Sequence, residues 1–171
     1  MEELAALLRP AAVGLLVDVR SIPRSRTNPQ FNIDELPAAL ALLDIAYRHL
    51  PALGGRRHRA RDAPPSVNTY WEVAAFRNYA DYAATESFRG GLAQLRALAG
   101  AHHCAVMCAE AVWWRCHRRI IADYLLSDGA TVMHIMGANK IEPARLTPGA
   151  RLQADGSLVY RPVGPANPCR T

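Results

Sequence analysis

The residues best suited to chemistry lie in the segment CAVMCAEAVWWRCHRRIIADYLL, residues 104–126. A short apolar run ends there at Cys108 and Glu110, and Cys116, His117 and Arg118 stand where an amphipathic stretch begins. A short apolar run followed by a helix is typical of a buried parallel strand and its crossover. In such folds ligands bind where strands end and helices begin. We therefore expect a site at this corner.

A second corner of the same type lies near the start of the chain, in VGLLVDVRSIPRSRTNPQFN, residues 13–32. The apolar run from Val13 to Val17 is followed by Asp18, Arg20 and Arg24, with Asn28 close behind. If both strands belong to one parallel sheet, their carboxyl ends meet at the same edge. The two corners, although far apart in the sequence, would then line one pocket.

Three residues are candidates for acid–base catalysis: Glu110, His117 and Asp18. A carboxylate directly after a buried strand can be desolvated and act as a general acid or base, which makes Glu110 the central candidate. For each residue a structural role is open as well. Glu110 and Asp18 could pair with arginine, and His117 continues an apolar helix face and could be a hydrogen-bonded core residue.

The cysteines suggest metal binding or nucleophilic chemistry. Their spacing argues against a zinc ion shared by Cys104 and Cys108, and the residues after Cys108 do not match a phosphatase loop. Four residues along a strand separate two side chains by roughly 13 Å, too far to share a zinc ion. No paired C-x-x-C spacing is present, and we expect no metal and no cofactor. The arginine at the sixth position of a phosphatase loop is missing after Cys108, where Trp114 stands. Cys116 could have a lowered pKa beside basic neighbours, although a packed thiol is the simpler interpretation.

Arginine is the usual residue for bidentate recognition of phosphate or carboxylate. Nineteen of the twenty basic residues are arginine, and the net charge is +5. We assign Arg20, Arg24 and Arg118 to substrate binding, with Asn28 and Cys116 beside them. The leading hypothesis is a small enzyme acting on an anionic small molecule or nucleotide.

A basic loop supports an alternative function. Residues 51–68 contain paired glycines and prolines and the run RRHRAR, and a loop of this length is usually functional or disordered. Its arginines could follow a phosphate backbone and make the chain a nucleic-acid-associated binding module, or the loop could be ordinary solvated surface. The four arginines are Arg56, Arg57, Arg59 and Arg61.

Hydrophobic periodicity predicts an α/β fold with a mainly parallel sheet. We expect helices over 2–9, 34–43, 71–84, 87–99 and 114–127, and strands over 13–19, 46–50, 103–108 and 131–136. A hairpin about Asp155 and Gly156 should follow, and then a proline-rich tail. The length of 171 residues predicts a single domain over 1–171, with its core at about 13–136 and the hairpin and tail at about 145–171.

The composition is that of an ordinary globular protein, half hydrophobic and one fifth charged. No apolar run is long enough for a membrane helix, and no secretory signal is evident. Four cysteines without an export signal predict a reduced, cytoplasmic protein that does not interact with membranes. The sequence does not indicate an oligomeric state.

Several of these segments together resemble the domain of unknown function 488 family. The resemblance extends from about residue 13 to 136, and it implies a Rossmann-like three-layer α/β sandwich in the cytoplasm, with no established activity. Asp18, Arg20, Arg24, Glu110, Cys116, His117 and Arg118 stand at positions of the family motifs. The matching segments are DVRSIPRSRTNPQFN (18–32), HLPALGGRR (49–57), FRNYADY (76–82), MCAEAVWWRCHRRIIADYL (107–125) and VMHI (132–135).

The sequence departs from the family pattern at its start. Members usually begin with a strand carrying a Gly-His-Ser/Thr motif before the first helix, whereas this sequence starts at the helix. The resemblance therefore leaves open an inactive, N-terminally truncated paralogue as a third hypothesis.

Overall fold

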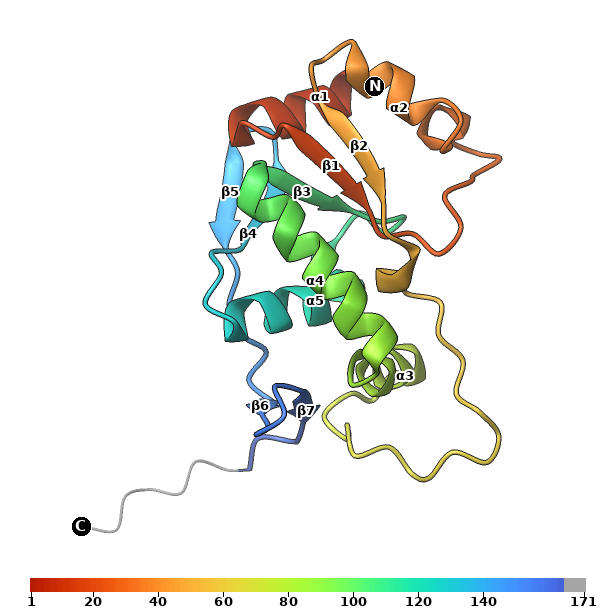
Figure 1. Ribbon diagram of the computed structural model, residues 1–171, viewed down its shortest axis with the longest axis vertical. Helices are drawn as coiled ribbons and strands as arrows, with labels where there is room; N and C mark the ends of the chain where they lie inside the picture. Colours follow the sequence, from red (N-terminus) through yellow and green to blue (C-terminus); the bar gives the residue numbers. More distant parts are fainter. Residues whose placement is uncertain (165–171) are drawn as a thin grey trace, which may run out of the picture.

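The computed structural model describes residues 1–164 and shows a mixed α/β fold (Figure 1). The helices are α1 (Glu2–Leu8), α2 (Leu36–Ala41), α3 (Ala74–Ala83), α4 (Glu86–Ala101) and α5 (Arg118–Ser127). The strands are β1 (Leu15–Asp18), β2 (Ala46–His49), β3 (Cys104–Met107), β4 (Met133–Gly137), β5 (Lys140–Pro143), β6 (Ala150–Leu152) and β7 (Leu158–Tyr160). Short 3-10 turns lie at Arg9–Ala11, Pro29–Phe31, Pro51–Leu53 and Trp113–Arg115.

A three-stranded parallel sheet in the order β2-β1-β3 forms the centre of the fold. Asp18 at the end of β1 stands opposite His49 of β2 and Met107 of β3. The carboxyl ends of all three strands therefore meet at one edge. This confirms that the corner after Val17 and the corner after Met107 open on the same side.

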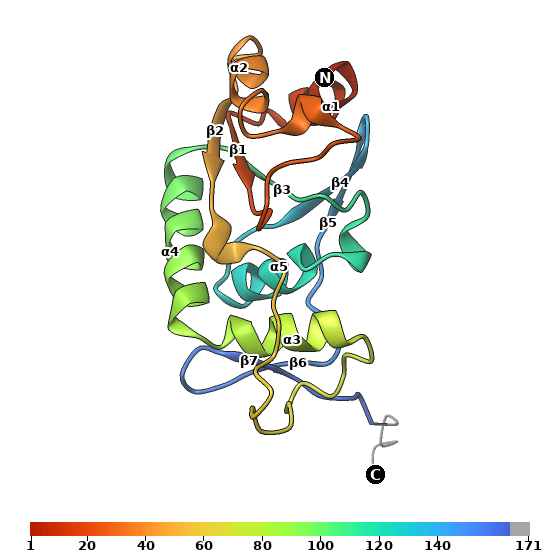
Figure 2. The same cartoon turned by 90° about the vertical axis from the view of Figure 1, so that its right-hand side faces the viewer.

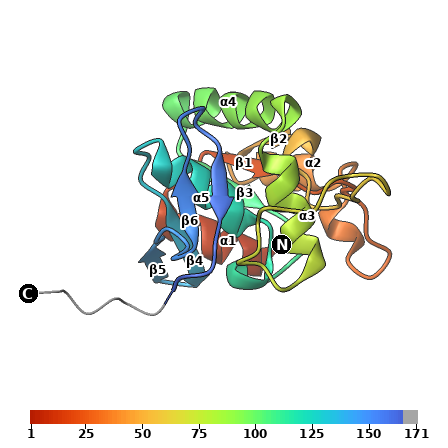
Figure 3. The same ribbon diagram turned by 90° about the horizontal axis from the view of Figure 1, so that it is seen from below.

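Helices cover both faces of this sheet, because neighbouring side chains of β1 point to opposite faces. Leu15 and Val17 pack into a core with α3, α4 and α5, while Leu16 packs with α1 and α2. Figures 2 and 3 show α4 and α1 on opposite sides of the strands. The sheet is thus enclosed, and its carboxyl edge is the part left open to loops.

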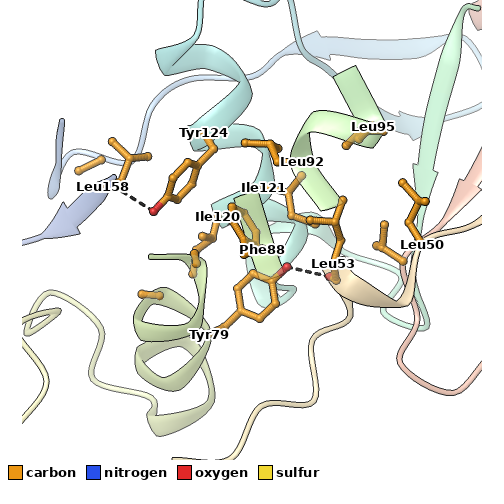
Figure 4. Packing of buried hydrophobic residues seen from close by; sticks show 14 of the residues in the cluster. Leu50, Leu53, Tyr79, Phe88, Leu92, Leu95, Ile120, Ile121, Tyr124 and Leu158 are labelled. Atoms are coloured by element: carbon orange, nitrogen blue, oxygen red, sulfur yellow. Dashed lines mark hydrogen bonds between the residues drawn. The ribbon is translucent and has the colours of Figure 1, made fainter. Parts of the chain in front are cut away.

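Buried tyrosines connect the larger core to loops outside the sheet (Figure 4). The Tyr79 hydroxyl donates to the carbonyl of Leu53 at 2.7 Å, and the Tyr124 hydroxyl accepts from the amide of Leu158 at 3.0 Å. Both rings are buried. These bonds fix the segment after β2 and the start of β7 to the helices.

The remaining strands form two antiparallel hairpins. The predicted hairpin about Gly156 is confirmed as β6–β7, and the tail predicted after it lies outside the described residues from 165 onward. The strand predicted over 131–136 is β4, but it pairs with β5, which the sequence analysis did not predict. The prediction of a mainly parallel sheet therefore holds for three strands only.

Two helix boundaries differ from the prediction. The helix expected from residue 71 begins at Ala74, because Trp71 is used as a core residue before it. The helix expected from residue 114 begins at Arg118, after a 3-10 turn and an extended Cys116. Over residues 1–164, no helix combines the length and apolarity needed to cross a membrane.

Candidate functional site

A cavity of about 390 Å³ lies at the carboxyl edge of the sheet. It is formed by the loops that follow β1, the Pro51–Leu53 turn and β3, together with the start of α3. The two corners predicted to share one pocket do share it. The lining residues are Arg20, Ser21, Ile22, Arg24, Ser25, Gly55, Arg56, Ala75, Phe76, Cys108, Ala109, Glu110, Arg115, Cys116 and His117.

Two cysteines meet at the wall of this cavity. The Cys108 sulfur lies directly after β3 and is 2.8 Å from the Cys116 sulfur, which lies two residues before α5. Cys116 is buried and Cys108 is partly buried. The loop between them returns to the strand end at which it started, and this brings together two sulfurs eight residues apart.

Nitrogen atoms of Arg118 and His117 surround the Cys116 sulfur. The backbone amide of Arg118 lies 3.4 Å away, its guanidinium Nε 3.3 Å away, and the Nδ1 of His117 3.5 Å away. The hydrogen bond from Cys108 lowers the pKa of Cys116, and His117 and the Arg118 amide lower it further against the effect of burial. Within the pair, these contacts favour the thiolate form at Cys116.

Cys108 is the protonated partner. Its hydrogen bond to Cys116, its burial and the negative charge of that neighbour raise the pKa of Cys108. The backbone amide of Glu110 also donates to the Cys108 sulfur at 3.2 Å. Cys104, at the other end of β3, is not part of this cluster, and burial raises its pKa.

Arg118 contacts both the Cys116 sulfur and the loop after β3. Its Nη2 donates to the carbonyl of Glu110 at 2.6 Å while its Nε faces the Cys116 sulfur. The guanidinium thus connects the start of α5 to the loop after β3. The structure places Arg118 beside the site, and its role in substrate binding stays a prediction.

Glu110 lines the cavity with its side chain exposed. Among residues 1–164 its carboxylate forms no hydrogen bond or ion pair, and the interactions of Glu110 run through its backbone amide and carbonyl. The desolvation on which the acid–base argument was based is therefore not present. Neither is the predicted alternative, a carboxylate paired with arginine.

Asp18 and Arg20 form a buried pair. Arg20 donates from Nε and Nη2 to the carboxylate, with the Nη2–Oδ2 distance 2.6 Å, and the Tyr47 hydroxyl donates to the same Oδ2. Arg20 also donates to the carbonyl of Phe31. The structural alternative given for Asp18, a carboxylate paired with arginine, is thus observed, and the pair holds the loop after β1.

His117 lies between the cavity and the core. Its ring is 4.9 Å from the ring of Tyr79, and its Nε2 is buried without a hydrogen-bond partner in the described part of the chain. A Cβ at Gly55 would overlap this ring, so the absence of a side chain there makes room for His117. The imidazole is thus held against the thiolate.

The other predicted binding residues are more scattered. Arg24 lines the cavity and pairs with Asp34 on the surface, whereas Asn28 is exposed and outside the lining. Arg56 lines the cavity. Arg57 is engaged by the carbonyls of Pro51, Ala52 and Gly54 and stacks on Tyr82, while Arg59 and Arg61 lie exposed along the loop.

Two sulfurs and an imidazole nitrogen could hold a soft metal ion, and those of Cys108, Cys116 and His117 lie within 4.8 Å of one another. This cluster was not predicted, because the spacing argument compared Cys108 with Cys104 and not with Cys116. The Arg118 guanidinium, 3.3 Å from the Cys116 sulfur, brings a positive charge to one of these three ligand atoms. The same contact stabilises negative charge on Cys116.

The functional feature missed in the sequence is the Cys108–Cys116 pair as a unit. One signal for it was available: one cysteine ends a strand and the other begins the next helix, and these are the positions that a crossover brings together. The thiolate site could have been proposed on that ground.

Comparison with known proteins gives one match. A family model described as "Domain of unknown function DUF488" matches residues 1–125, which include every residue that lines the cavity. No curated protein and no solved structure matches the chain.

Proposed function

This chain belongs to the DUF488 family, and because that description assigns no activity, we propose that it is a cysteine-dependent enzyme acting on a small anionic substrate. The substrate carries phosphate or carboxylate and binds at the carboxyl edge of a Rossmann-like, three-layer sandwich. The observation that carries the proposal is the Cys116 sulfur at the cavity wall, with four donors around it.

Cys116 is the nucleophile. Donors within 3.5 Å stabilise its negative charge, and a thiolate is the reactive form of cysteine. Cys108 keeps its proton and donates to that thiolate. His117 and Arg118 hold the sulfur in place, and the charge of Arg118 also favours the ionised form.

Two arginines are available for the anionic part of the substrate. Arg56 and Arg115 line the cavity, and over residues 1–164 neither guanidinium forms a hydrogen bond or ion pair. Unpaired guanidinium groups facing a cavity suit bidentate binding of phosphate or carboxylate. Arg24, paired only on the surface with Asp34, can add to this field.

Glu110 is the acid–base candidate through its place in the cavity lining and not through burial. Its exposed carboxylate is the acidic group among the described residues that line the cavity, and it is therefore the group assigned to proton exchange with a leaving group. Glu110→Gln should leave Tm within a few degrees of the parent, because no partner is lost. Turnover should fall while alkylation of Cys116 stays unchanged; unchanged turnover would remove Glu110 from the mechanism.

Alkylation with a charged and a neutral reagent tests the site itself. Iodoacetate is a carboxylate and iodoacetamide is not, so the arginines should favour iodoacetate at Cys116 relative to Cys104 in the same chain. The preference should shrink in Arg56→Gln and Arg115→Gln, and labelling of Cys116 should persist at pH values where Cys104 is protonated. If Cys104 labels while Cys116 does not, or if the anionic reagent has no advantage, the proposal fails.

Turnover is the second arm of this test. A set of phosphate and carboxylate esters assayed with the parent, Cys116→Ser and Cys104→Ser should show activity that is lost only in Cys116→Ser. Equal activity of all three chains would exclude Cys116 as the nucleophile.

A further inference from the structure

Cys108 has chemistry beyond its hydrogen bond to Cys116. Its sulfur is 2.8 Å from the nucleophile and lines the same cavity, so it is the first thiol that a group bound to Cys116 would meet. The two sulfurs of a disulfide are about 2 Å apart. The sulfurs of Cys108 and Cys116 would therefore have to approach each other by less than about 1 Å to form one. Cys104 begins β3 at the opposite end of the strand and is not part of the cavity lining.

We propose that Cys108 and Cys116 form a dithiol–disulfide couple, in which Cys116 attacks a small carboxylate-bearing disulfide and Cys108 resolves the product. This inference rests on the proposed function, because it uses the same thiolate and the same arginine-lined cavity. It adds a reaction, thiol–disulfide exchange, and a substrate class.

The exchange proceeds in two balanced steps. The Cys116 thiolate attacks one sulfur of the substrate RS–SR, which breaks the S–S bond, forms the mixed disulfide Cys116–S–SR and releases RS⁻. Cys108 then gives its proton to the released thiolate and attacks the Cys116 sulfur, which expels the second RS⁻. The protein loses two electrons as its disulfide forms, and the substrate gains them as one thiol and one thiolate, which takes its proton from water.

The electrostatics of the pair favour this order of events. The charge of Cys116 is one of the causes that keep Cys108 protonated, and that charge disappears once Cys116 is bound in the mixed disulfide. Cys108 then ionises more easily, at the stage where its thiolate is needed. The resolving thiol is therefore held back until the substrate has been captured.

The cavity selects the substrate by charge. Arg56 and Arg115 face it without partners in the described chain, so a disulfide with carboxylates is favoured over a neutral one. Glutathione disulfide supplies carboxylates on a small, flexible frame and serves as the probe. Bis(2-hydroxyethyl) disulfide is a smaller, neutral comparison, and the arginine variants separate the effect of charge from that of size.

The experiment uses the full chain with Cys104 and Cys169 replaced by serine, reduced and then freed of reductant. Exposure to glutathione disulfide should consume both remaining thiols, release two glutathione molecules per chain and lower the mass by two hydrogens. The Cys108→Ser version should stop at a stable mixed disulfide on Cys116, and the Cys116→Ser version should react at least about tenfold more slowly. Arg56→Gln with Arg115→Gln should remove the advantage of the anionic probe.

Two results would overturn the inference: glutathione on both cysteines without an internal disulfide, or thiols that persist while iodoacetate still labels Cys116. In the second case the proposed nucleophile stands and only the exchange reaction fails. Failure of iodoacetate to label Cys116 in the same preparation would contradict both the proposed nucleophile and the exchange reaction. Cys108→Ala provides a second resolving-thiol variant if the serine version does not fold.

Discussion

Asp18 contributes mainly to the stability of the fold, although it stands at the edge of the site. Its carboxylate is fully buried and bound by Arg20 and Tyr47. Replacing Asp18 by Asn leaves the Arg20 guanidinium buried without its counter-charge. Such a loss costs about 3–5 kcal/mol. We expect Tm to fall by on the order of 10 °C in calorimetry.

An exposed ion pair of the same loop region provides the control. Arg24 and Asp34 are 2.9 Å apart, with exposed fractions of 62% and 58%. Because water screens such pairs, Asp34→Asn should cost at most about 1 kcal/mol. Equal losses for the two variants would mean that burial of the Asp18–Arg20 pair does not determine its contribution.

At the scale of single residues, the sequence predicted which residues gather at the site but not all the contacts that they make there. Strand ends and helix starts located Asp18, Arg20, Glu110, Cys116 and His117, because parallel topology fixes where such positions meet. The contact between the two sulfurs depends on the path of the loop after β3, and periodicity carries no information about loops. The exposed carboxylate of Glu110 was unpredictable for the same reason.

At the scale of elements, helix α4 packs closely against the turn after β2, and this contact determines which of its glycines can be replaced. A Cβ at Gly91 would lie 2.9 Å from the Cβ of Ala52, whereas one at Gly90 would meet nothing within 4 Å. Gly90→Ala should stabilise the exposed face of the helix by about 0.5–1 kcal/mol. Gly91→Ala should instead destabilise the protein, because overpacking costs about 1–3 kcal/mol.

Urea unfolding of the two variants measures this difference directly. Both changes are glycine to alanine in the same helix, so helix propensity cancels in the comparison. If Gly91→Ala proves as stable as Gly90→Ala, α4 can move away from Ala52 without loss, and the close contact is not required.

The β4–β5 hairpin should make stability depend on pH. His134 stacks on Trp113 with ring centroids 3.9 Å apart, and burial, with the charge of Arg118, lowers its pKa below the ordinary value of 6.5. Between the lowered pKa and 6.5 the unfolded chain binds more protons, so the free energy of unfolding rises with pH in that window and levels off above it.

His134→Phe keeps an aromatic ring against Trp113 and removes the titrating group. Denaturant titrations at several pH values between about 5 and 7 should show a shallower rise in this variant than in the parent. Identical profiles would show that protonation of His134 costs the folded state nothing.

Elements with a clear period were predicted, and short or exposed ones were not. The apolar runs of β1 and β3 and the turn residues of the β6–β7 hairpin predicted strands within a few residues of those observed. β5 was missed, because a four-residue strand with mostly exposed side chains has no apolar pattern. The early start predicted for helix α3 was wrong, because an amphipathic period does not distinguish a helix from a core tryptophan placed before it.

The two ends of the sequence share one core. The family model ends at residue 125, yet Ala150, Leu158 and Tyr160 belong to the same buried cluster as Leu15 and Val17. Tyr160 is fully buried, and its hydroxyl donates to the Asp123 carboxylate at 3.0 Å. At the scale of the whole molecule, the segment beyond the match completes the core.

This sharing predicts a single cooperative unit over the described chain. A chain cut after Gly164 should unfold in one transition, with calorimetric and van't Hoff enthalpies in agreement. A chain cut after Ala144 loses the hairpin and exposes the apolar faces of α3 and α5, so it should lose its cooperative transition and near-ultraviolet dichroism. If the chain cut at Ala144 kept the parent transition, the hairpin would not be needed for folding, and the core of residues 1–125 would then be sufficient by itself.

Point mutants of Tyr160 test the same packing within the intact chain. Tyr160→Ala should lower the free energy of unfolding by about 3–5 kcal/mol. Tyr160→Phe removes only the hydroxyl and should lower it by about 1–3 kcal/mol.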